Sequence, residues 1–486
     1  MPVDATHDAP APAIGALARM SAFDLLKGYR KRKFSPTEVL EEVIDALAQT
    51  DVVCNVMVEP MFDSARTAAR SADQAWMKGE PGGALCGVPV TVKDLIYVAD
   101  VPARGGAPAF ENFVPKADAA VVESLRRAGA VLTCKTTTCE SGYKLTADSP
   151  ITGVTRNPWR LSRTSGGSSG GAAAAVAAGC GPLAVGTDGV GSIRVPSSFC
   201  GVVGIKPTFG LVPRAPGFFP PSWASLAHTG PIARNVRDVA TLLETISGYD
   251  LRDAASLHTS SIHYDSAPGR LNGLRIAYSV DLGFAQVATE VRAAFEDALK
   301  ALRTLGAETM AAEFHLDADI IEGIIKPIAY TEQAAAAIDR EAAVLDRSDP
   351  EYQAVLKRGR GYLGVDYIGA MHRRTQLRSK FLKLFESASV LVTPTVAVPA
   401  FSAGTLGVDK IEGETVDQHL GWSPFTWPIN LVGLPAATLP CGYDRDGMPI
   451  GLQIVAPWLC EQDVFRVASA LEAEFSFQNL WPGFTP

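Results

Sequence analysis

Two glycine-rich turns that carry serine lie close together between Ser165 and Pro207, and they constrain the fold more than any other feature of the sequence. The segment reads SGGSSGGAAAAVAAGCGPLAVGTDGVGSIRVPSSFCGVVGIKP, and its serines 168 and 192 are 24 residues apart. Between the turns the sequence predicts a small-residue helix over 171–178 and a short apolar strand over 183–186. Glycine tolerates positive φ and lets a ligand approach the main chain closely. A flexible linker would not join an apolar strand to such a turn, so we interpret the segment as buried and functional.

The uncharged stretch from Thr164 to Thr187 is long enough to be mistaken for a membrane span. Its glycines, serines and alanines supply too little hydrophobicity and Pro182 interrupts it, so we expect no membrane association. The first residues, MPVDATHDAPAPAIG, contain neither a basic nor an apolar signal region, which indicates a cytoplasmic protein. The net charge of −8 argues against nucleic acid as a partner, because a nucleic-acid backbone calls for a basic face.

The eight cysteines are scattered, and none of them repeats with metal-ligand spacing or clusters with the seven histidines. We therefore expect buried free thiols in a reducing compartment and no metal site. The cysteines are Cys54, Cys86, Cys134, Cys139, Cys180, Cys200, Cys441 and Cys460.

Helix and strand patterns alternate along the chain and predict an α/β sheet with helices on its faces. The apolar spacing is helical from Met20 to Ala48, and Ser35-Pro36 is typical of a helix start inside that stretch. A helix over 119–128 is followed by a strand over 130–134. Further strands are expected over 88–92, 274–278 and 390–393, and further helices over 64–77, 288–304 and 351–386.

Domain organisation follows from what the sequence lacks. Average domain length would suggest two or three domains in 486 residues. However, the sequence shows no internal repeat and no linker that marks a clean boundary. We expect a flexible tail over 1–19 and a single domain over 20–486, with a helical insertion over roughly 285–386. The stretch Ser256–Pro268 is the best loop candidate before that insertion.

The turn that leads into Ser192 can direct several main-chain amides at one oxygen beside a hydroxyl, which is the arrangement of an oxyanion hole. A serine nucleophile also needs a base. No histidine lies near these turns in sequence, although tertiary contact could supply His228 or another. A lysine can serve if burial keeps it neutral, and Lys93 closes the apolar run VPVTV. A single lysine at a strand end is usually solvated, so this pattern alone leaves the identity of the base open.

Several motifs together resemble those of the amidase signature family over about residues 20–475. They are GVPVTVKD around Lys93, GGSSGG at 166–171, GTDGVGSIRVP at 186–196 followed by GIKPT, and the later blocks YIGAMHRRTQLRSKFLKLFESASVLVTPT and INLVGLPAATLPCG…PIGLQIVAP. The resemblance implies a large mixed central sheet covered by helices on both faces. It also implies an amidohydrolase that cleaves a small-molecule carboxylic amide, or a related anilide or carbamate, without metal or cofactor.

The same resemblance implies a role for each member of a Ser-Ser-Lys triad. The serine of the GSIR motif, Ser192, is expected to be the nucleophile that forms an acyl-enzyme. The first serine of GGSSGG, Ser168, is expected to follow a cis peptide bond and to relay the proton. The lysine of the KD motif, Lys93, is expected to be the base.

One position departs from the family pattern. The usual turn reads GTD-x-GGS, whereas this chain has valine at 190, between Gly189 and Gly191. A β-branched side chain restricts backbone angles, although its amide can still donate. We expect the backbone amides of Gly189, Val190 and Gly191 to form the oxyanion hole, in a loop or pocket reshaped by the valine.

Other residues are expected around the site. Asp188 and Arg194 flank the nucleophile and are expected to pair and hold the loop, and Ser169 is expected to lie near the triad. The segment KTTTCESGY matches the family's pocket-lining segment and places Gly142 and Tyr143 in the substrate pocket. Six aromatic residues favour an apolar, aryl amide or carbamate as the substrate: Phe218, Phe219, Trp223, Trp422, Phe425 and Trp427. For the first three, ordinary core packing is the alternative.

Two short motifs are weaker matches to other chemistry. Residues 166–170 fit the G-x-S-x-G pattern of a nucleophile elbow, but the preceding RNPWR has no strand character. Ser141 and Lys144 fit S-x-x-K, which is expected by chance in a chain of this length.

Two alternative functions remain. The A subunit of a glutamyl-tRNA amidotransferase shares the signature, although the acidic charge and residues 351–374 argue against it. A non-catalytic binding protein on the same scaffold is disfavoured because all three triad positions are present. The sequence leaves open whether the protein is a homodimer.

Overall fold

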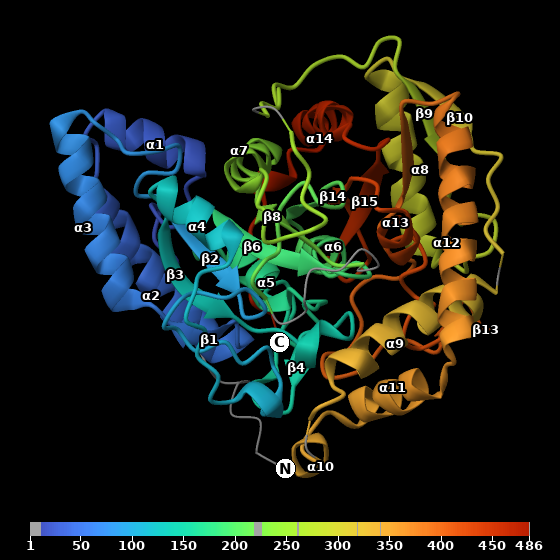
Figure 1. Ribbon diagram of the computed structural model, residues 1–486. Helices are drawn as coiled ribbons and strands as arrows, with labels where there is room; N and C mark the ends of the chain where they lie inside the picture. Colours follow the sequence, from blue (N-terminus) through green and yellow to red (C-terminus); the bar gives the residue numbers. More distant parts are fainter. Residues whose placement is uncertain (1–10, 218–225, 260–261, 318, 341, 486) are drawn as a thin grey trace.

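The computed structural model describes residues 11–217, 226–259, 262–317, 319–340 and 342–485. An eleven-stranded mixed sheet runs through the molecule in the order β1-β3-β2-β6-β8-β7-β14-β15-β11-β9-β10, with helices on both faces (Figure 1). The predicted α/β class with a large mixed central sheet is therefore confirmed. The strands are β1 (Met57–Pro60), β2 (Pro89–Lys93), β3 (Val131–Thr136), β6 (Leu183–Asp188), β7 (Val203–Lys206), β8 (His228–Ala233), β9 (Arg275–Tyr278), β10 (Glu308–Ala311), β11 (Val390–Pro394), β14 (Ala436–Tyr443) and β15 (Pro449–Val455).

One strand pair determines where the glycine-rich turns lie. β2 and β6 are parallel neighbours, with Val90 opposite Leu183 and Val92 opposite Val185. The carboxyl ends of parallel strands meet at the same edge of a sheet. The last residue of β2, Lys93, is therefore brought beside the end of β6, although β3 lies between the two strands in sequence.

The N-terminal region forms three helices, α1 (Ala22–Arg30), α2 (Pro36–Cys54) and α3 (Phe62–Lys78). The predicted start at Ser35-Pro36 is confirmed, because Ser35 and Glu38 form a capping box. The helical spacing over 20–48 is divided between two helices rather than continuous. Arg32, in the connection, has a φ of 54°, which no α-helix accommodates.

The glycine-rich segment contains α5 (Gly170–Ala178) and α6 (Arg194–Cys200), and every residue of both helices is buried. A helix of glycine and alanine has no polar face, so it can be enclosed on all sides. A Cβ atom at Gly171 would lie 2.7 Å from the carbonyl oxygen of Val56, so this position accepts only glycine. The prediction that the segment is buried is confirmed. Among the described residues, no helix has the length and apolarity that a bilayer crossing requires.

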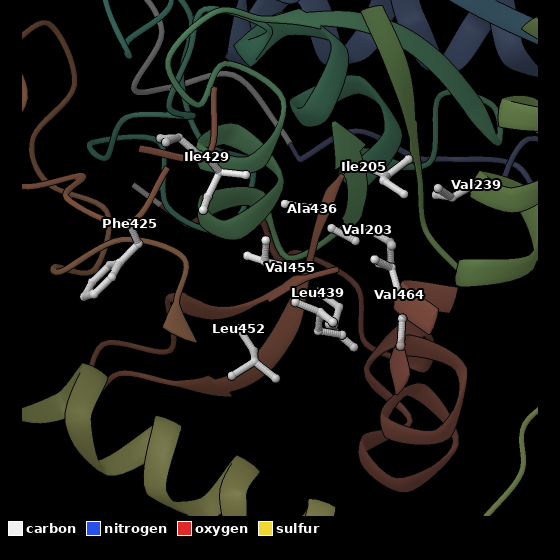
Figure 2. Packing of buried hydrophobic residues seen from close by; sticks show 14 of the residues in the cluster. Val203, Ile205, Val239, Phe425, Ile429, Ala436, Leu439, Leu452, Val455 and Val464 are labelled. Atoms are coloured by element: carbon white, nitrogen blue, oxygen red, sulfur yellow. The ribbon is translucent and has the colours of Figure 1, made fainter. Parts of the chain in front are cut away.

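The second half of the sheet is covered by α7 (Val236–Ile246), α8 (Thr289–Thr304), α13 (Trp427–Val432) and α14 (Glu461–Phe475). Side chains from strands and helices meet there in a continuous apolar core (Figure 2). The residues labelled in that view include Val203, Ile205, Val239, Ile429, Leu439, Leu452, Val455 and Val464.

The helices α9 (Lys326–Ala336) and α11 (Pro350–Gly361) pack against each other near the lower end of α12 (Gly364–Phe385) in Figure 1, and the short α10 (Ala342–Leu345) lies below them, next to η1 (Pro108–Phe110). The prediction of a single helix over 351–386 is wrong. The stretch forms two helices, because Tyr362 and Leu363 both adopt extended backbone angles, with ψ of 135° and 160°. The stretch 285–386 is also not helical throughout, since it contains the strand β10, which pairs with β9.

The remaining elements are short: α4 (Ala120–Arg127), η1 (Pro108–Phe110), η2 (Glu140–Gly142), η3 (Ile321–Ile325), η4 (Phe477–Asn479), β4 (Asp148–Ser149), β5 (Gly153–Val154), β12 (Lys410–Ile411) and β13 (Glu414–Thr415).

Candidate active site

The Lys93 side chain ends among hydroxyl groups of the first glycine-rich turn. Its Nζ atom donates to Ser168 Oγ at 2.7 Å, to Ser169 Oγ at 2.9 Å and to Thr187 Oγ1 at 2.9 Å. The three oxygens come from the turn before α5 and from the end of β6. The parallel pairing of β2 with β6 therefore assembles this cluster from residues far apart in sequence.

Burial controls the charge of Lys93. The residue has no exposed surface, and its hydrogen-bond partners are neutral oxygens. Burial lowers the pKa of Lys93 to about 7, and nearby Cys139 and Asp188 oppose that shift only in part. At neutral pH a substantial fraction of the lysine is thus the free amine, which can accept a proton.

The turn around Ser168 is held against neighbouring backbone. The Gly167–Ser168 peptide bond is cis. A Cβ atom at Gly167 would lie 2.1 Å from the carbonyl oxygen of Thr146, so only glycine fits there. The amide of Ser169 donates to the carbonyl of Ser192 at 3.1 Å, which connects the two serine-bearing turns directly.

The second turn is shaped by one carboxylate. Asp188 accepts hydrogen bonds from the amides of Gly191 at 2.8 Å and Ile193 at 3.1 Å, and from Nε of Arg194 at 3.0 Å. Burial alone would raise the pKa of Asp188. The charge and hydrogen bonds of Arg194, together with Asn430, instead hold that pKa well below its usual range. The expected pairing of Asp188 with Arg194 is confirmed, and both residues are fully buried.

The expectation that Gly191 donates to an oxyanion is wrong, because its amide is already bonded to Asp188. Gly191 has a φ of 134°, and a Cβ atom there would lie 2.5 Å from Thr426 Oγ1. Val190 does not adopt positive φ, so the β-branched side chain is tolerated without a strained backbone. Its carbonyl accepts from Thr426 Oγ1 at 2.7 Å. The valine therefore occupies a position of the loop that does not require glycine.

Both serines face one cavity of about 360 Å³. Its lining is mainly apolar. It draws on the ends of β2 and β6, on α4, on η2 and the residue after it, on the turn before α5, on the segment between β7 and β8, on α9 and α11, and on the loop at 419–420. The residues that line it include Leu95, Ile96, Ala119, Val121, Gly142, Tyr143, Ser168, Gly189, Val190, Ser192, Arg214, Leu226, Ala329, Tyr330, Glu332, Val355, His419 and Leu420.

Gly142 and Tyr143 lie in the cavity wall next to Ser168. A Cβ atom at Gly142, whose φ is 69°, would lie 3.4 Å from Ser168 Oγ. The wall is fixed by His419, whose Nε2 lies 3.2 Å from the carbonyl oxygen of Tyr143 and whose Nδ1 lies 2.7 Å from the hydroxyl of Tyr330. Burial lowers the pKa of His419 to about 4, so it is neutral at pH 7. α9 is thereby connected to the wall beside Ser168.

Comparison with known proteins places this geometry in a family. The amidase family model matches residues 38–465. An acylamidase of Rhodococcus erythropolis is 35% identical over 464 residues, covering 93% of this chain and 95% of that protein. The chain belongs to the amidase signature family.

Two further comparisons show the range of relatives of this amidase. A bacterial aryl acylamidase of the amidase signature enzymes has a TM-score of 0.89 at 27% identity, covering 96% of this chain and 99% of its own. The A subunit of the glutamyl-tRNA(Gln) amidotransferase of Thermosynechococcus vestitus is 35% identical over 467 residues, covering 91% of this chain and 95% of that relative. The amidase is accordingly a hydrolase that acts on carbon–nitrogen bonds of amides.

Three of the aromatic residues expected near the substrate are placed elsewhere. Trp422, Phe425 and Trp427 are fully buried in the core of the amidase and do not line the cavity. Trp422 packs between the rings of Phe199 and Phe401. The reason is that residues 422–432 pack beneath the loop that carries Ser192, where Thr426 contacts Val190. Phe218, Phe219 and Trp223 lie outside the described residues.

His228, the alternative base, is turned away from the serines. Its Nδ1 contacts the carbonyl oxygens of Leu226 at 2.7 Å and Asp188 at 3.2 Å. Burial holds the pKa of His228 well below its usual range. No described hydrogen bond joins it to Ser168 or Ser192.

Several residues of the site were missed from the sequence. Thr187 accepts a hydrogen bond from Lys93. Asn430 donates to Asp188, and Gln453 accepts from Arg194. Thr426 donates to the carbonyl of Val190. Thr187 and Asn430 stand inside the quoted GTD and INLVGLP motifs, so attention to those motifs could have found them. Thr426 has no such signal.

Proposed function

We propose that this amidase uses Ser192 as nucleophile, Ser168 as proton relay and Lys93 as base. The observation that carries the proposal is the 2.7 Å contact between the buried Lys93 amine and Ser168 Oγ, on a cavity that Ser192 also lines. Neutral Lys93 accepts the proton of Ser168 while Ser168 accepts that of Ser192, whose Oγ attacks the amide carbonyl carbon. The relay returns a proton to the departing nitrogen as the carbon–nitrogen bond breaks. Water then hydrolyses the acyl-enzyme by the same route, and the sequence of steps requires neither metal nor cofactor.

The amides of Gly189, Val190 and Ser192 are the proposed donors to the oxyanion. Gly189 and Val190 line the cavity beside Ser192, whereas the amide of Gly191 is occupied by Asp188. Such preorganised donors stabilise the charge that develops on the carbonyl oxygen. The Asp188–Arg194 pair stabilises this loop, because Asp188 accepts the amides of Gly191 and Ile193.

The proposed substrate is an amide, anilide or carbamate with an apolar or aryl part. The support is the apolar lining of the cavity, contributed by residues such as Leu95, Val121, Leu226 and Val355. The similarity to an aryl acylamidase structure points the same way. Trp422, Phe425 and Trp427 lie in the core and give no support to an aryl substrate.

Covalent labelling tests the proposed nucleophile. A fluorophosphonate should modify the wild-type protein once, and peptide mass spectrometry should place the adduct on Ser192. Ser192→Ala should remain unlabelled. The matched control is Ser197→Ala on α6, whose Oγ has no hydrogen-bond partner and should not affect labelling. A wild-type protein that is folded and unlabelled would exclude this mechanism and revive the non-catalytic alternative.

The second candidate function is that of the A subunit of an amidotransferase. The 35% identity to the Thermosynechococcus vestitus relative favours keeping it. It predicts glutaminase activity that appears only when companion proteins of the complex and charged tRNA are added. Hydrolysis of simple anilides by the isolated chain, without stimulation by those companions, would decide for the hydrolase.

We further propose that residues 20–486 act as one unit in the cytoplasm. The support for one unit is the continuous sheet from β1 to β10, which joins both halves of the chain. Limited proteolysis should then release no independently stable fragment.

A further inference from the structure

We infer that the side chain of Val190 determines the acyl specificity of this site, and that it selects acyl groups whose first carbon after the carbonyl is unbranched. The inference rests on the proposed function, since it assigns part of the substrate of the same site. Val190 stands two residues before the proposed nucleophile Ser192, and both residues line the cavity. Val190 is half-buried and packs in part against the main apolar core. Its remaining surface is available to a group bonded to the carbonyl carbon that Ser192 attacks.

The backbone at Val190 is fixed, because both polar atoms of the peptide group that follows it are hydrogen-bonded. The carbonyl oxygen of Val190 accepts from Thr426 Oγ1 at 2.7 Å, and the amide of Gly191 donates to Asp188 at 2.8 Å. Thr426 and Asp188 are both fully buried, and Asp188 is itself paired with Arg194. We therefore expect this peptide group to keep its position when a bulky substrate approaches.

The side chain of Val190 is constrained as well. Its φ is not positive, and a β-branched side chain has few accessible rotamers. A longer, flexible side chain could turn away from a substrate, whereas the two methyl groups of valine cannot both leave the cavity wall. With glycine at this position a ligand could approach the main chain itself. The valine therefore acts as a rigid wall at the reacting carbonyl group.

The proton relay indicates which half of the substrate meets this wall. In the proposed mechanism Ser168 returns a proton to the departing nitrogen, so the nitrogen must face Ser168. Gly142 lies on that side, since a Cβ atom there would be 3.4 Å from Ser168 Oγ. Val190 belongs to the other turn, and no hydrogen bond within the described part of the chain joins it to Ser168 or Lys93. The acyl half is therefore the one that extends along Val190.

The test uses two substrates that differ by one methyl group on the first acyl carbon, the propionyl and 2-methylpropionyl p-nitroanilides. The ratio of their kcat/KM values is divided by the ratio of their hydroxide-catalysed rates, which removes the difference in intrinsic reactivity. In the wild type this corrected ratio should favour the propionyl compound by about tenfold or more, as expected for one methyl group that a rigid apolar site does not accommodate.

Variants then assign the preference to Val190. Val190→Ala removes two methyl groups and should bring the corrected ratio to near one. The matched control is Val365→Ala on α12, at a residue that is 74% exposed, which should keep the wild-type ratio. A second substrate pair keeps the propionyl group and replaces p-nitroaniline by 2-methyl-4-nitroaniline, so that the methyl group is on the leaving amine. Val190→Ala should not alter the effect of that methyl group.

Circular dichroism and melting curves show whether Val190→Ala is folded. If that variant is unfolded or inactive, the corrected wild-type ratio still decides. Three results would overturn the inference: a corrected wild-type ratio near one, a preference that survives in folded Val190→Ala, or an equal response of the leaving-amine pair to that variant. Failure of the proposed function would look different, because no substrate would then be hydrolysed in a manner that requires Ser192.

Discussion

Lys93 Nζ lies 2.7 Å from Ser168 Oγ, at the point where two parallel strands end side by side. The amine is completely enclosed, and its hydrogen-bond partners are hydroxyl and carbonyl oxygens instead of carboxylates. A lysine paired with a carboxylate would remain an ammonium ion. This one is hydrogen-bonded to dipoles alone, which is the environment that makes a lysine able at neutral pH to accept a proton from a serine.

Replacing Lys93 by alanine should lower kcat by about 10²–10⁴-fold, because the proton relay loses its acceptor. In the wild type, kcat/KM should rise with pH through a value near 7, since the base must be deprotonated and burial lowers the pKa of Lys93 to about 7. Initial rates on an anilide from pH 5 to 10 measure both effects. Lys116→Ala, at an exposed position, is the control and should leave the profile unchanged. A Lys93→Ala variant with near wild-type rates throughout would rule out the assigned base.

The same burial should make Lys93 unfavourable for stability. Between pH 7 and pH 10.5 the unfolded chain binds a proton at this lysine that the folded chain does not, so wild-type stability should rise with pH in that window. Lys93→Met removes the cost of burying an amine and leaves each of three hydroxyls with one hydrogen-bond partner fewer. We expect a net stabilisation of about 1–3 kcal/mol at pH 7 that shrinks toward pH 10.5. Urea unfolding at both pH values measures it. A variant less stable than wild type at pH 7 would contradict the expectation.

Two glycines of the loop that leads into Ser192, Gly189 and Gly191, should respond differently to alanine. In Gly191→Ala the new Cβ atom would lie 2.5 Å from Thr426 Oγ1 at a φ of 134°, so we expect a loss of about 2–4 kcal/mol and most of the activity. In Gly189→Ala the Cβ atom meets nothing within 4 Å, so stability should change by less than about 0.5 kcal/mol. Because Gly189 lines the cavity, that variant should mainly raise KM. Melting curves and steady-state kinetics of the pair decide. Equal destabilisation would contradict the loop geometry.

Breaking the Asp188–Arg194 pair should be severe. Asp188→Asn leaves the buried guanidinium without its counter-ion, and we expect a loss of about 3–5 kcal/mol. The depressed pKa of Asp188 means that its stabilising contribution is present above the unfolded-state pKa of about 4. That contribution is lost only as the pH falls toward the folded-state value. In urea unfolding, the double variant Asp188→Asn/Arg194→Gln should lose less than the sum of the two single variants. Additive losses would mean that the two side chains do not act as a pair.

The local features of the fold were predictable because their causes are local. Ser35-Pro36 caps α2, and the alanine-rich segment forms the enclosed helix α5. The apolar strand before Lys93 predicted a buried terminus. The break at Tyr362–Leu363 was missed, although Gly361 and Gly364 flank the two extended residues and glycine is a signal for the end of a helix.

The tertiary part of the site was harder to predict. Trp422 and Trp427 are aromatic residues that could equally line a pocket or fill a core, and their positions depend on packing against Phe199, Phe401 and Phe284. The occupied amide of Gly191 depends on the direction of the Asp188 carboxylate, which no spacing rule gives. The similarity of the motifs indicated which residues gather at the site. The geometry shows which of their atoms are not already hydrogen-bonded within the protein and can contact a substrate.

The pairing of β2 with β6 has a consequence for how this protein acquires its activity. Lys93 and Ser168 are 75 positions apart, and the strand that follows β2 in sequence occupies the opposite side of it. Such non-local pairings form slowly, because a long loop must close before they are stabilised. A refolding chain should therefore regain helix content well before it regains hydrolysis. The enzyme's own turnover would then report the moment at which the centre of the sheet closes.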